Sequence, residues 1–213
     1  MRGSMTDLFL AALLGYLAGA IPFSYIAGRV FGGVDLRRYG SGNLGATNTF
    51  RLLGARIALV VLAADVAKGF VPVVAAPGVG APGEVPREWL MLTAAFFAVI
   101  GHMFSVFVSF AGGKGVATMA GAFLALAPWA LLVTVAVYAA VFAAKRIVSL
   151  ASIVGAVVFP IAVFVLDRTG LAAAPWPLRA ASVLISIVVL FKHRSNMRRL
   201  VRGEESVLQR IQR

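Results

Sequence analysis

The sequence predicts an all-α protein that crosses a membrane several times. Of its 213 residues, 61% are hydrophobic and 13% are charged, and the mean hydropathy is +0.93. The apolar residues come in long runs, and a helix needs about 20 residues to cross about 30 Å of hydrocarbon. We therefore expect one polytopic membrane domain over residues 5–213. The preceding MRGS, residues 1–4, is typical of an expression-tag remnant before a second methionine.

Five apolar runs have the length of a single span. They are roughly 6–30, 57–77, 89–110, 148–166 and 176–192. A sixth run, 116–144, is too long for one upright span and short for two. Pro128 lies near its middle, and Trp129, a residue type that favours the membrane interface, follows. The sequence thus predicts a break at Pro128, some short helices and seven spans in all.

The distribution of charge supports seven spans. With that count, 15 of the 20 lysines and arginines fall on one side, in the 29–56 loop, the Lys114 loop, the Lys145–Arg146 turn and the carboxyl-terminal tail. On the other side, Arg2, Arg87, Arg168 and Arg179 are balanced by Asp7, Glu84, Glu88 and Asp167. A single helix over 116–144 would abolish this asymmetry. The positive-inside rule therefore predicts the amino terminus outside and the carboxyl terminus in the cytoplasm.

Composition also limits the function. The net charge of +12 is explained by attraction to the anionic membrane surface, so we expect membrane lipid rather than nucleic acid as its partner. The chain has no cysteine, which excludes disulfides, thiolate catalysis and cysteine-ligated metal. Asp35 is the only acid in the first three predicted cytoplasmic loops and turns. Since magnesium-dependent nucleotide chemistry normally needs a carboxylate ligand, we expect a site without metal or cofactor that takes one or two anionic substrates.

The first polar motif is GSGNLGATN, residues 40–48, followed by Arg51. Glycines allow successive backbone N–H groups to line a concavity, and a helix that starts near Thr47 would direct its positive end at an anion. Arg51 adds a fork of donors that suits phosphate. The alternative is an ordinary glycine-rich turn in which Thr47 or Asn48 caps a helix.

The second motif is GGKGVAT, residues 112–118. Lys114 in a glycine turn at a helix N-terminus would suit a phosphate. The motif is similar to the end of a Walker A loop, but Phe107 stands where the first glycine belongs and we expect no strand before it, which argues against a nucleotide-binding loop. The alternative is a lysine whose ammonium group extends to lipid headgroups.

Four further polar residues lie at predicted span ends on the cytoplasmic side. His102 lies near the end of the third span, where a packing role is the alternative to a functional one. Ser149 opens the sixth span, and a helix N-cap would be enough to explain it. His193 and Asn196, three residues apart at the end of the seventh span, share one helix face.

Asp65 and Lys68 are also three residues apart, within the second span. Ionisable groups inside a membrane are costly and often functional. Their spacing allows them to neutralise each other, so we expect a structural pair, with a proton or substrate relay as the alternative.

Together, GSGNLGATN…R, GH-x-F…GGKGVAT, R-x-x-SLASI and HR-x-N resemble the bacterial acyl-phosphate-dependent glycerol-3-phosphate acyltransferases of the PlsY type, over about residues 6–205. The resemblance implies a seven-helix enzyme of the bacterial inner membrane with a cytoplasmic active site. It would transfer a fatty acyl group from acyl phosphate to the 1-hydroxyl of glycerol 3-phosphate, yielding lysophosphatidic acid and phosphate in phospholipid synthesis. It implies no cofactor and no required protein partner. The family usually has proline where Ser105 stands and lysine where Ala111 stands.

The resemblance also assigns roles to residues. The loop of the GSGNLGATN motif, residues 40–48, which we call the Ser41 loop, would surround the phosphate and carbonyl of the acyl donor. Arg51, Lys114 and Ser149 would hold the phosphate of glycerol 3-phosphate, and His193 and Asn196 would position its glycerol part. The catalytic candidates are Ser41, His193 and Asn196, and the substrate-binding candidates are Gly40, Gly42, Asn43, Gly45, Thr47, Asn48, Arg51, His102, Gly113, Lys114 and Ser149.

Two questions stay open at the level of sequence. The proton of the glycerol hydroxyl could pass to His193 or His102, or to a phosphate oxygen of a substrate, and the scarcity of carboxylates favours the phosphate. The rival function is a membrane transporter for a phosphorylated metabolite, which basic loops and the Asp65–Lys68 pair would suit. Against a transporter, the polar motifs cluster on one face of the predicted membrane domain.

Overall fold

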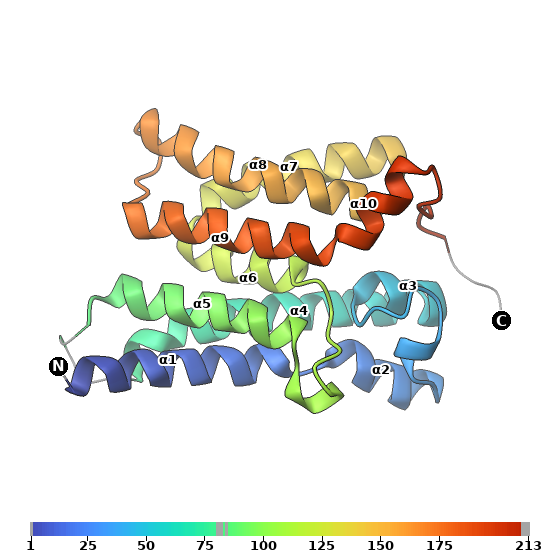
Figure 1. Ribbon diagram of the computed structural model, residues 1–213, viewed down its shortest axis with the longest axis horizontal. Helices are drawn as coiled ribbons and strands as arrows, with labels where there is room; N and C mark the ends of the chain where they lie inside the picture. The colour runs from blue at the N-terminus through green and yellow to red at the C-terminus, as the bar shows by residue number, and fades with distance from the viewer. Residues whose placement is uncertain (1, 80–82, 84, 210–213) are drawn as a thin grey trace. The chain divides into compact units, whose positions relative to one another are not determined.

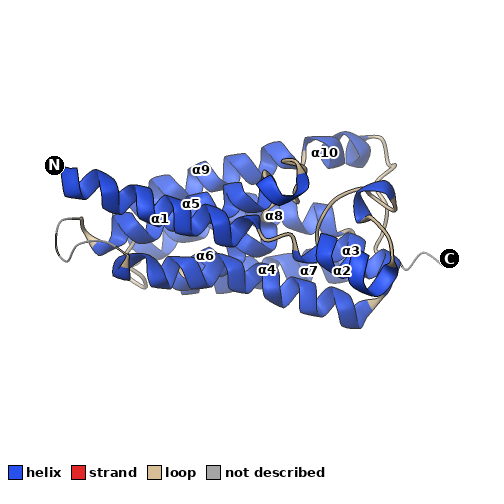
Figure 2. Cartoon of the chain, turned by 90° about the horizontal axis from the view of Figure 1, so that it is seen from below, coloured by secondary structure: helices blue, strands red, loops and turns tan. Residues whose placement is uncertain are grey.

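A computed structural model describes residues 2–79, 83 and 85–209, and the regular secondary structure of these residues is entirely helical (Figures 1 and 2). The chain forms two compact units, one up to Ala125 and one from Leu126 to Gln209. Met1 of the expected tag remnant, and Glu84, Arg210 and Arg213 of the charge count, lie outside the described residues.

The first unit contains six α-helices and three 3-10 turns within the described residues. They are α1 (Arg2–Ala20), α2 (Phe23–Gly32), η1 (Leu36–Arg38), α3 (Ala46–Leu53), α4 (Ala55–Ala75), η2 (Ala76–Gly78), α5 (Arg87–Met103), η3 (Val106–Val108) and α6 (Val116–Leu126), which ends at the boundary between the units. The second unit contains α7 (Pro128–Lys145), α8 (Val148–Arg168), α9 (Trp176–Lys192) and α10 (Arg194–Val201). In this unit α8 packs against both α7 and α9.

The predicted break at Pro128 is confirmed. Helix α6 ends at Leu126, and α7 begins at Pro128, whose missing N–H costs nothing at the first position of a helix. Among the described residues, five segments are long and apolar enough to span a membrane, and α9 with α10, bent by 60°, adds a sixth if the bent pair is one span. The five are Ser4–Gly32, Ala55–Gly78, Arg87–Val108, Pro128–Lys145 and Val148–Arg168. Helix α6 is a shorter apolar helix, so seven spans and the orientation of the termini stay predictions.

The predicted first span, 6–30, is divided into α1 and α2 at Ile21 and Pro22. Proline ends the first helix because its ring clashes with the preceding turn and it has no N–H to donate. Carbonyl groups that lose their helical partner in this way need another donor. The Ser105 hydroxyl donates to the carbonyl oxygen of Ala20, and the Lys68 ammonium donates to that of Ile21 at 2.7 Å. Two side chains from other segments thus stabilise the break.

The predicted pair of Asp65 and Lys68 is confirmed. Lys68 Nζ lies 2.7 Å from Asp65 Oδ1, and both side chains are buried. His102 Nδ1 lies 3.7 Å from the same carboxylate oxygen. A buried charge needs a partner, and here each charge of the pair has one.

The third predicted span, 89–110, also differs in detail from the structure, since α5 ends at Met103 and a 3-10 turn follows.

Small residues allow α1 and α5 to approach closely (Figure 1). A Cβ atom at Gly15 would collide with the Ala94 carbonyl, and one at Gly19 would collide with the Ala98 carbonyl. This spacing of four residues on both helices is the small-residue pattern that brings membrane helices into backbone contact. Packing of the two helices therefore depends on the absence of side chains at these glycines.

Two glycines place α6 on α4 in the same manner. A Cβ at Gly69 would collide with the Thr118 carbonyl, and one at Gly121 would collide with the Val66 carbonyl. Because α6 begins directly after the Lys114 loop, its contact with α4 fixes where that loop ends.

Candidate active site

The Ser41 loop is organised from inside by the side chain of Asn48. Asn48 Oδ1 accepts a hydrogen bond from the backbone N–H of Ser41 at 3.0 Å. Its Nδ2 donates to the carbonyl oxygens of Leu36, at 3.0 Å, and Tyr39, at 3.1 Å. Asn48 is fully buried, whereas Ser41 is exposed. The amide of Asn48 therefore holds the loop in a shape that presents Ser41 at the surface of the unit.

Glycine is required at the sharpest point of this loop. Gly40 and Gly42 have φ angles of 61° and 68°, in the left-handed region that other residues rarely adopt. A Cβ at Gly40 would also collide with Asn48 Oδ1. The loop ends where α3 begins at Ala46, close to the predicted start near Thr47. The N-cap is Gly45, so the alternative in which Thr47 or Asn48 caps this helix is wrong: both residues lie inside α3.

Arg51 lies one turn along α3, and its side chain is half-buried. Within the described residues, its guanidinium group makes no hydrogen bond or ion pair. An arginine without an internal partner keeps its planar fork of donors for a carboxylate or phosphate from outside.

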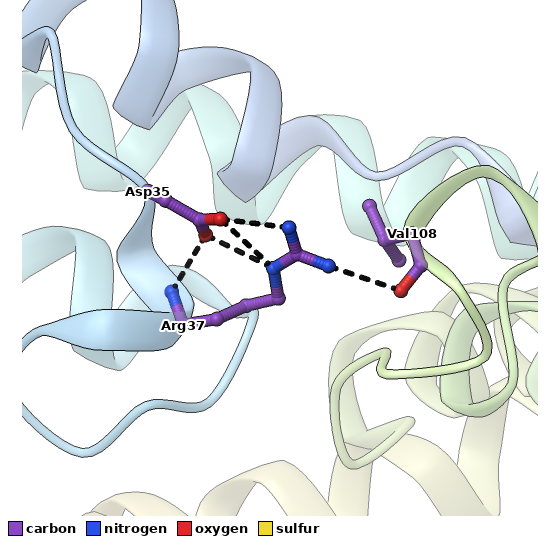
Figure 3. Close-up of polar contacts among 3 residues, drawn as sticks. All are labelled: Asp35, Arg37 and Val108. Carbon is purple, nitrogen blue, oxygen red and sulfur yellow. Dashed lines mark hydrogen bonds and ion pairs between the residues drawn. The ribbon is translucent and has the colours of Figure 1, made fainter.

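Asp35 and Arg37 join the start of the Ser41 loop to the turn after α5 (Figure 3). Arg37 donates to the Asp35 carboxylate from Nε, at 3.0 Å, and from Nη2, at 2.7 Å, and its Nη1 donates to the carbonyl oxygen of Val108 at 3.2 Å. The hydrogen bond from the Arg37 side chain lowers the pKa of Asp35 to about 2. Sequence reasoning counted Asp35 only as a rare acid and missed this bridge.

A small apolar cluster lies beneath the same loop. It consists of Leu36, Leu44, Leu52 and Val108, all buried. Leu44 is the one large apolar side chain of the GSGNLGATN motif, which gives it a packing role between polar neighbours. Burial of these side chains anchors both ends of the loop, because Leu36 precedes it and Leu52 lies in α3.

The Lys114 loop meets the Ser41 loop at Gly113. The backbone N–H of Gly113 donates to the carbonyl oxygen of His102 at 3.0 Å. A Cβ at Gly113 would collide with both His102 Nε2 and the carbonyl oxygen of Leu44. His102 is buried near the end of α5, as predicted. The structure therefore brings His102, Gly113 and the Ser41 loop together within the first unit.

The local structure around Lys114 differs from that of a nucleotide-binding loop. Helix α5 and the turn η3 precede it, where a Walker A loop follows a strand. Gly115, with φ of 82°, turns the chain into α6, which begins at Val116. Lys114 is half-buried just before this helix.

A small pocket lies behind the two loops in the first unit. It is lined by the α1–α2 break at Ala20–Ser24 together with Leu44, Asp65, Lys68, His102, Ser105, Gly112 and Gly113. Ser41, Arg51 and Lys114 do not line it. The pocket therefore belongs to the interior that supports the loops, and of the predicted substrate-binding residues it is lined by His102 and Gly113.

In the second unit, Ser149 lies in the first turn of α8 and is buried. The N-cap of this helix is Ile147 and has no side-chain bond, so the alternative in which Ser149 caps the helix is wrong. Ser149 Oγ instead donates to Glu205 Oε1 at 2.7 Å. Its hydroxyl is thus directed at an anionic group.

His193 lies at the bend between α9 and α10, and Asn196 lies in α10. Both side chains are buried, but the bend separates them, so they do not share one face of a single helix as predicted. His193 Nδ1 lies 2.8 Å from the carbonyl oxygen of Val189. Since a carbonyl can only accept, Nδ1 carries a proton, and the neutral ring has its lone pair on Nε2.

The residue that sequence reasoning missed in this unit is Glu205. Its carboxylate accepts hydrogen bonds from Ser149 Oγ, from Asn196 Nδ2 at 2.6 Å and from Arg199 Nε at 2.6 Å. Burial raises the pKa of the Glu205 carboxyl, but hydrogen bonds from Ser149, Arg199 and Asn196 outweigh this, so the pKa lies below its usual value. Gly203, with φ of 70°, turns the chain back after α10. This glycine was the one signal in the sequence for a turn that brings Glu205 back to the helices.

The chain is similar to known proteins over almost its whole length. The sequence profile described as glycerol-3-phosphate acyltransferase matches residues 9–203. A glycerol-3-phosphate acyltransferase of Anaeromyxobacter sp. strain Fw109-5 is 41% identical over 94% of this chain and 98% of its own. One of Trichlorobacter lovleyi is 44% identical over 90% of this chain and 92% of its own.

Two solved structures are also similar. Both are PlsY, an integral membrane glycerol 3-phosphate acyltransferase. The glycerol 3-phosphate form has a TM-score of 0.83 and 36% identity, and covers 96% of each chain. The lysophosphatidic acid form has a TM-score of 0.80 and 35% identity, and covers 95% of each chain. On the extent of the profile match and the identity to these relatives, the chain belongs to the glycerol-3-phosphate acyltransferase family.

Proposed function

We propose that this protein transfers a fatty acyl group from acyl phosphate to the 1-hydroxyl of glycerol 3-phosphate, at the cytoplasmic face of the bacterial inner membrane. Relatives that share about two fifths of its residues are glycerol-3-phosphate acyltransferases, and the similar PlsY structures are a glycerol 3-phosphate form and a lysophosphatidic acid form. Substrate and product of one acylation are thus represented among its structural relatives. The topology in the proposal has seven spans, with the amino terminus outside.

The reaction needs no cofactor, because acyl phosphate is a mixed anhydride that is already activated for acyl transfer. The hydroxyl oxygen of glycerol 3-phosphate attacks the acyl carbon, and the bond from that carbon to the phosphate oxygen breaks. An ester forms, inorganic phosphate leaves, and the hydroxyl proton passes to an acceptor. The protein must align two anions and stabilise charge on the carbonyl oxygen.

The observation that carries the donor site is the Ser41 loop held by Asn48. Its two left-handed glycines and the nearby N-terminus of α3 favour binding of a phosphate and a polarised carbonyl. Ser41 is exposed, and we assign it the role of a hydrogen-bond donor near the acyl carbonyl. An acylated serine would require a histidine–carboxylate pair to activate it. Within the described residues, no such pair contacts the Ser41 hydroxyl.

The acceptor binds through side chains that carry positive charge or a hydroxyl. Arg51 and Lys114 supply positive charge for its phosphate, and Ser149 supplies a hydroxyl. His193 and Asn196 orient the glycerol part. His102 and Gly113 act on the binding loops, because they fix how the Lys114 loop packs against Leu44.

The proton of the hydroxyl passes to a phosphate oxygen of a substrate. His193 Nδ1 donates to a backbone carbonyl and not to a carboxylate, so that bond supplies no charge to raise the basicity of the ring. His193 then serves to position the glycerol part and takes no proton from it.

The experiment is a phosphate-release assay on purified protein in detergent. Phosphate released from acyl phosphate only when glycerol 3-phosphate is present, together with lysophosphatidic acid, supports the proposal. An Arg198→Gln variant, changed at an exposed residue of α10, serves as the control and should behave as the unchanged protein. Release that is independent of glycerol 3-phosphate, or no release, overturns the proposal. Uptake of glycerol 3-phosphate by vesicles without lysolipid formation would point to transport.

A further inference from the structure

The carboxyl-terminal segment after α10 folds back into the second unit in a defined way. Glu204 N–H donates to the carbonyl oxygen of Arg199 at 2.8 Å, and Leu208 N–H donates to that of Arg146 at 2.8 Å. These bonds flank Glu205, which lies between Ser149 of α8 and Asn196 of α10. The position of its carboxylate is therefore built into the fold of this unit.

The carboxylate occupies donors that the proposed function assigns to a substrate. Ser149 is the phosphate-binding hydroxyl of the second unit, and Asn196 is assigned to the glycerol part. Both donate to the same oxygen of Glu205, at 2.7 Å and 2.6 Å. Because the side chain of Glu205 is only 8% exposed, water competes little for these bonds.

Counting hydrogens shows that Ser149 cannot serve both groups at once. A serine hydroxyl has one hydrogen, and here it is donated to Glu205. A phosphate oxygen at Ser149 would need that same hydrogen. It would also lie a few ångström from a carboxylate of the same sign of charge, which repels it. Substrate binding at Ser149 therefore requires the bond to Glu205 to break.

We infer that the Glu205 carboxylate is an internal competitor for the phosphate of glycerol 3-phosphate, and so sets the affinity of the protein for this substrate. The inference rests on the proposed function. When phosphate binds, the Ser149 hydrogen passes from a Glu205 oxygen to a phosphate oxygen. Arg199, whose Nε donates to the other oxygen, Oε2, retains the displaced carboxylate. When product leaves, the carboxylate returns to Ser149.

The test compares two substitutions at Glu205 with one at its neighbour. Glu205→Gln keeps the length and an accepting oxygen but loses the charge, and Glu205→Asp keeps the charge but shortens the reach. Each weakens the competitor, so the KM for glycerol 3-phosphate should fall, by about fivefold for glutamine, while kcat does not rise. Glu204→Gln, an exposed residue in the same segment, is the control and should leave KM unchanged.

A double variant shows whether Ser149 is the contested group. In a Ser149→Ala background the hydroxyl is missing, so Glu205→Gln should change KM by less than about twofold. A KM that rises or stays the same in both Glu205 variants overturns the inference, because the carboxylate would then orient the donors or have no effect. A fivefold change that persists without the Ser149 hydroxyl also overturns it.

Calorimetric titration with inorganic phosphate measures the competition without turnover. The Glu205→Gln protein should bind phosphate more tightly than the unchanged protein and the Glu204→Gln control. Equal Kd values for the three proteins overturn the inference, whatever the acyl-transfer assay shows. Tighter binding by Glu205→Gln without any acyl transfer would contradict the proposed function alone.

Discussion

Asn48 holds the backbone of Ser41 through a hydrogen bond of 3.0 Å from the Ser41 N–H to the Asn48 amide oxygen. The same amide donates to two carbonyl groups earlier in the chain, so three backbone groups of one loop converge on a single buried side chain. The position of Ser41 is thus set by a residue seven positions later. Stability and activity should respond differently to changes at the two residues.

Replacing Asn48 should destabilise the protein. In Asn48→Ala the carbonyl oxygens of Leu36 and Tyr39 lose their donor, which we expect to cost about 3 kcal/mol and lower Tm by roughly 6–12 °C. Thermal unfolding in detergent measures this. Thr49→Val, at the residue next to Asn48, is the matched control. It removes one hydrogen bond, from the Thr49 hydroxyl to the Gly45 carbonyl oxygen, and should cost about 1 kcal/mol of stability. Equal effects of the two would mean that Asn48 does not organise the loop.

Replacing Ser41 should lower activity and leave stability unchanged. Ser41→Ala keeps the backbone N–H that bonds to Asn48, so Tm should stay within about 1 °C, while loss of a donor near the carbonyl should lower kcat about 100-fold. Steady-state kinetics with acyl phosphate measure the loss, and Ser195→Ala, an exposed serine of α10, is the control. An acylated Ser41 found by mass spectrometry would contradict the donor role and indicate a covalent intermediate.

Breaking the buried pair should cost more than removing it. Lys68→Met leaves the Asp65 charge without its ammonium partner and the Ile21 carbonyl without a donor, so we expect about 3–5 kcal/mol of destabilisation. The double variant Asp65→Leu/Lys68→Leu should regain part of that loss. If the pair is structural, the double variant also keeps kcat; a folded double variant without turnover would indicate a relay. Tm and kcat, measured on the same preparations, separate the two roles.

Acid should weaken the bridge between Asp35 and Arg37. The pKa of Asp35 is lowered from 3.8 to about 2, chiefly by the hydrogen bond from Arg37. A lowered pKa in the folded state contributes stability that is complete above pH 4 and is lost as the pH falls through about 2. Asp35→Asn should therefore be less stable than the unchanged protein at pH 6, by about 1 kcal/mol, with the difference shrinking between pH 4 and 2. A difference in Tm that is constant with pH would contradict this.

Local chemistry was sufficient to predict some elements. Pro128 divides an apolar run because its fixed φ and missing N–H favour the first turn of a helix, and the structure has its break there. The Asp65–Lys68 pair follows from helix geometry alone, since residues three apart are neighbours on one face. Pro22 carries the same local signal as Pro128, but it lies inside a run of the length of one span, which concealed the division between α1 and α2.

Other features depend on contacts between distant segments. The bond from Ser105 to the Ala20 carbonyl joins residues 85 positions apart, and that from Ser149 to Glu205 joins residues 56 apart. No period or motif specifies either contact, because each arises from the path of the chain between them. Charge counting placed Glu205 in the predicted cytoplasmic tail, but a count of charges does not show which side chain a carboxylate reaches.

The seam of small residues between α1 and α5 has a consequence for the synthesis of the chain. α1 packs chiefly against α5, and 83 residues separate Ala20 from Met103. At about 5–20 residues per second, a ribosome needs about 4 to 17 s to make that stretch. During this interval α1 lies in the bilayer before its main partner exists. Gly15 and Gly19 then face lipid, and Asp7, which is buried in the finished fold, is not yet covered. Substitutions on this face would therefore act first on membrane insertion, before the finished fold exists.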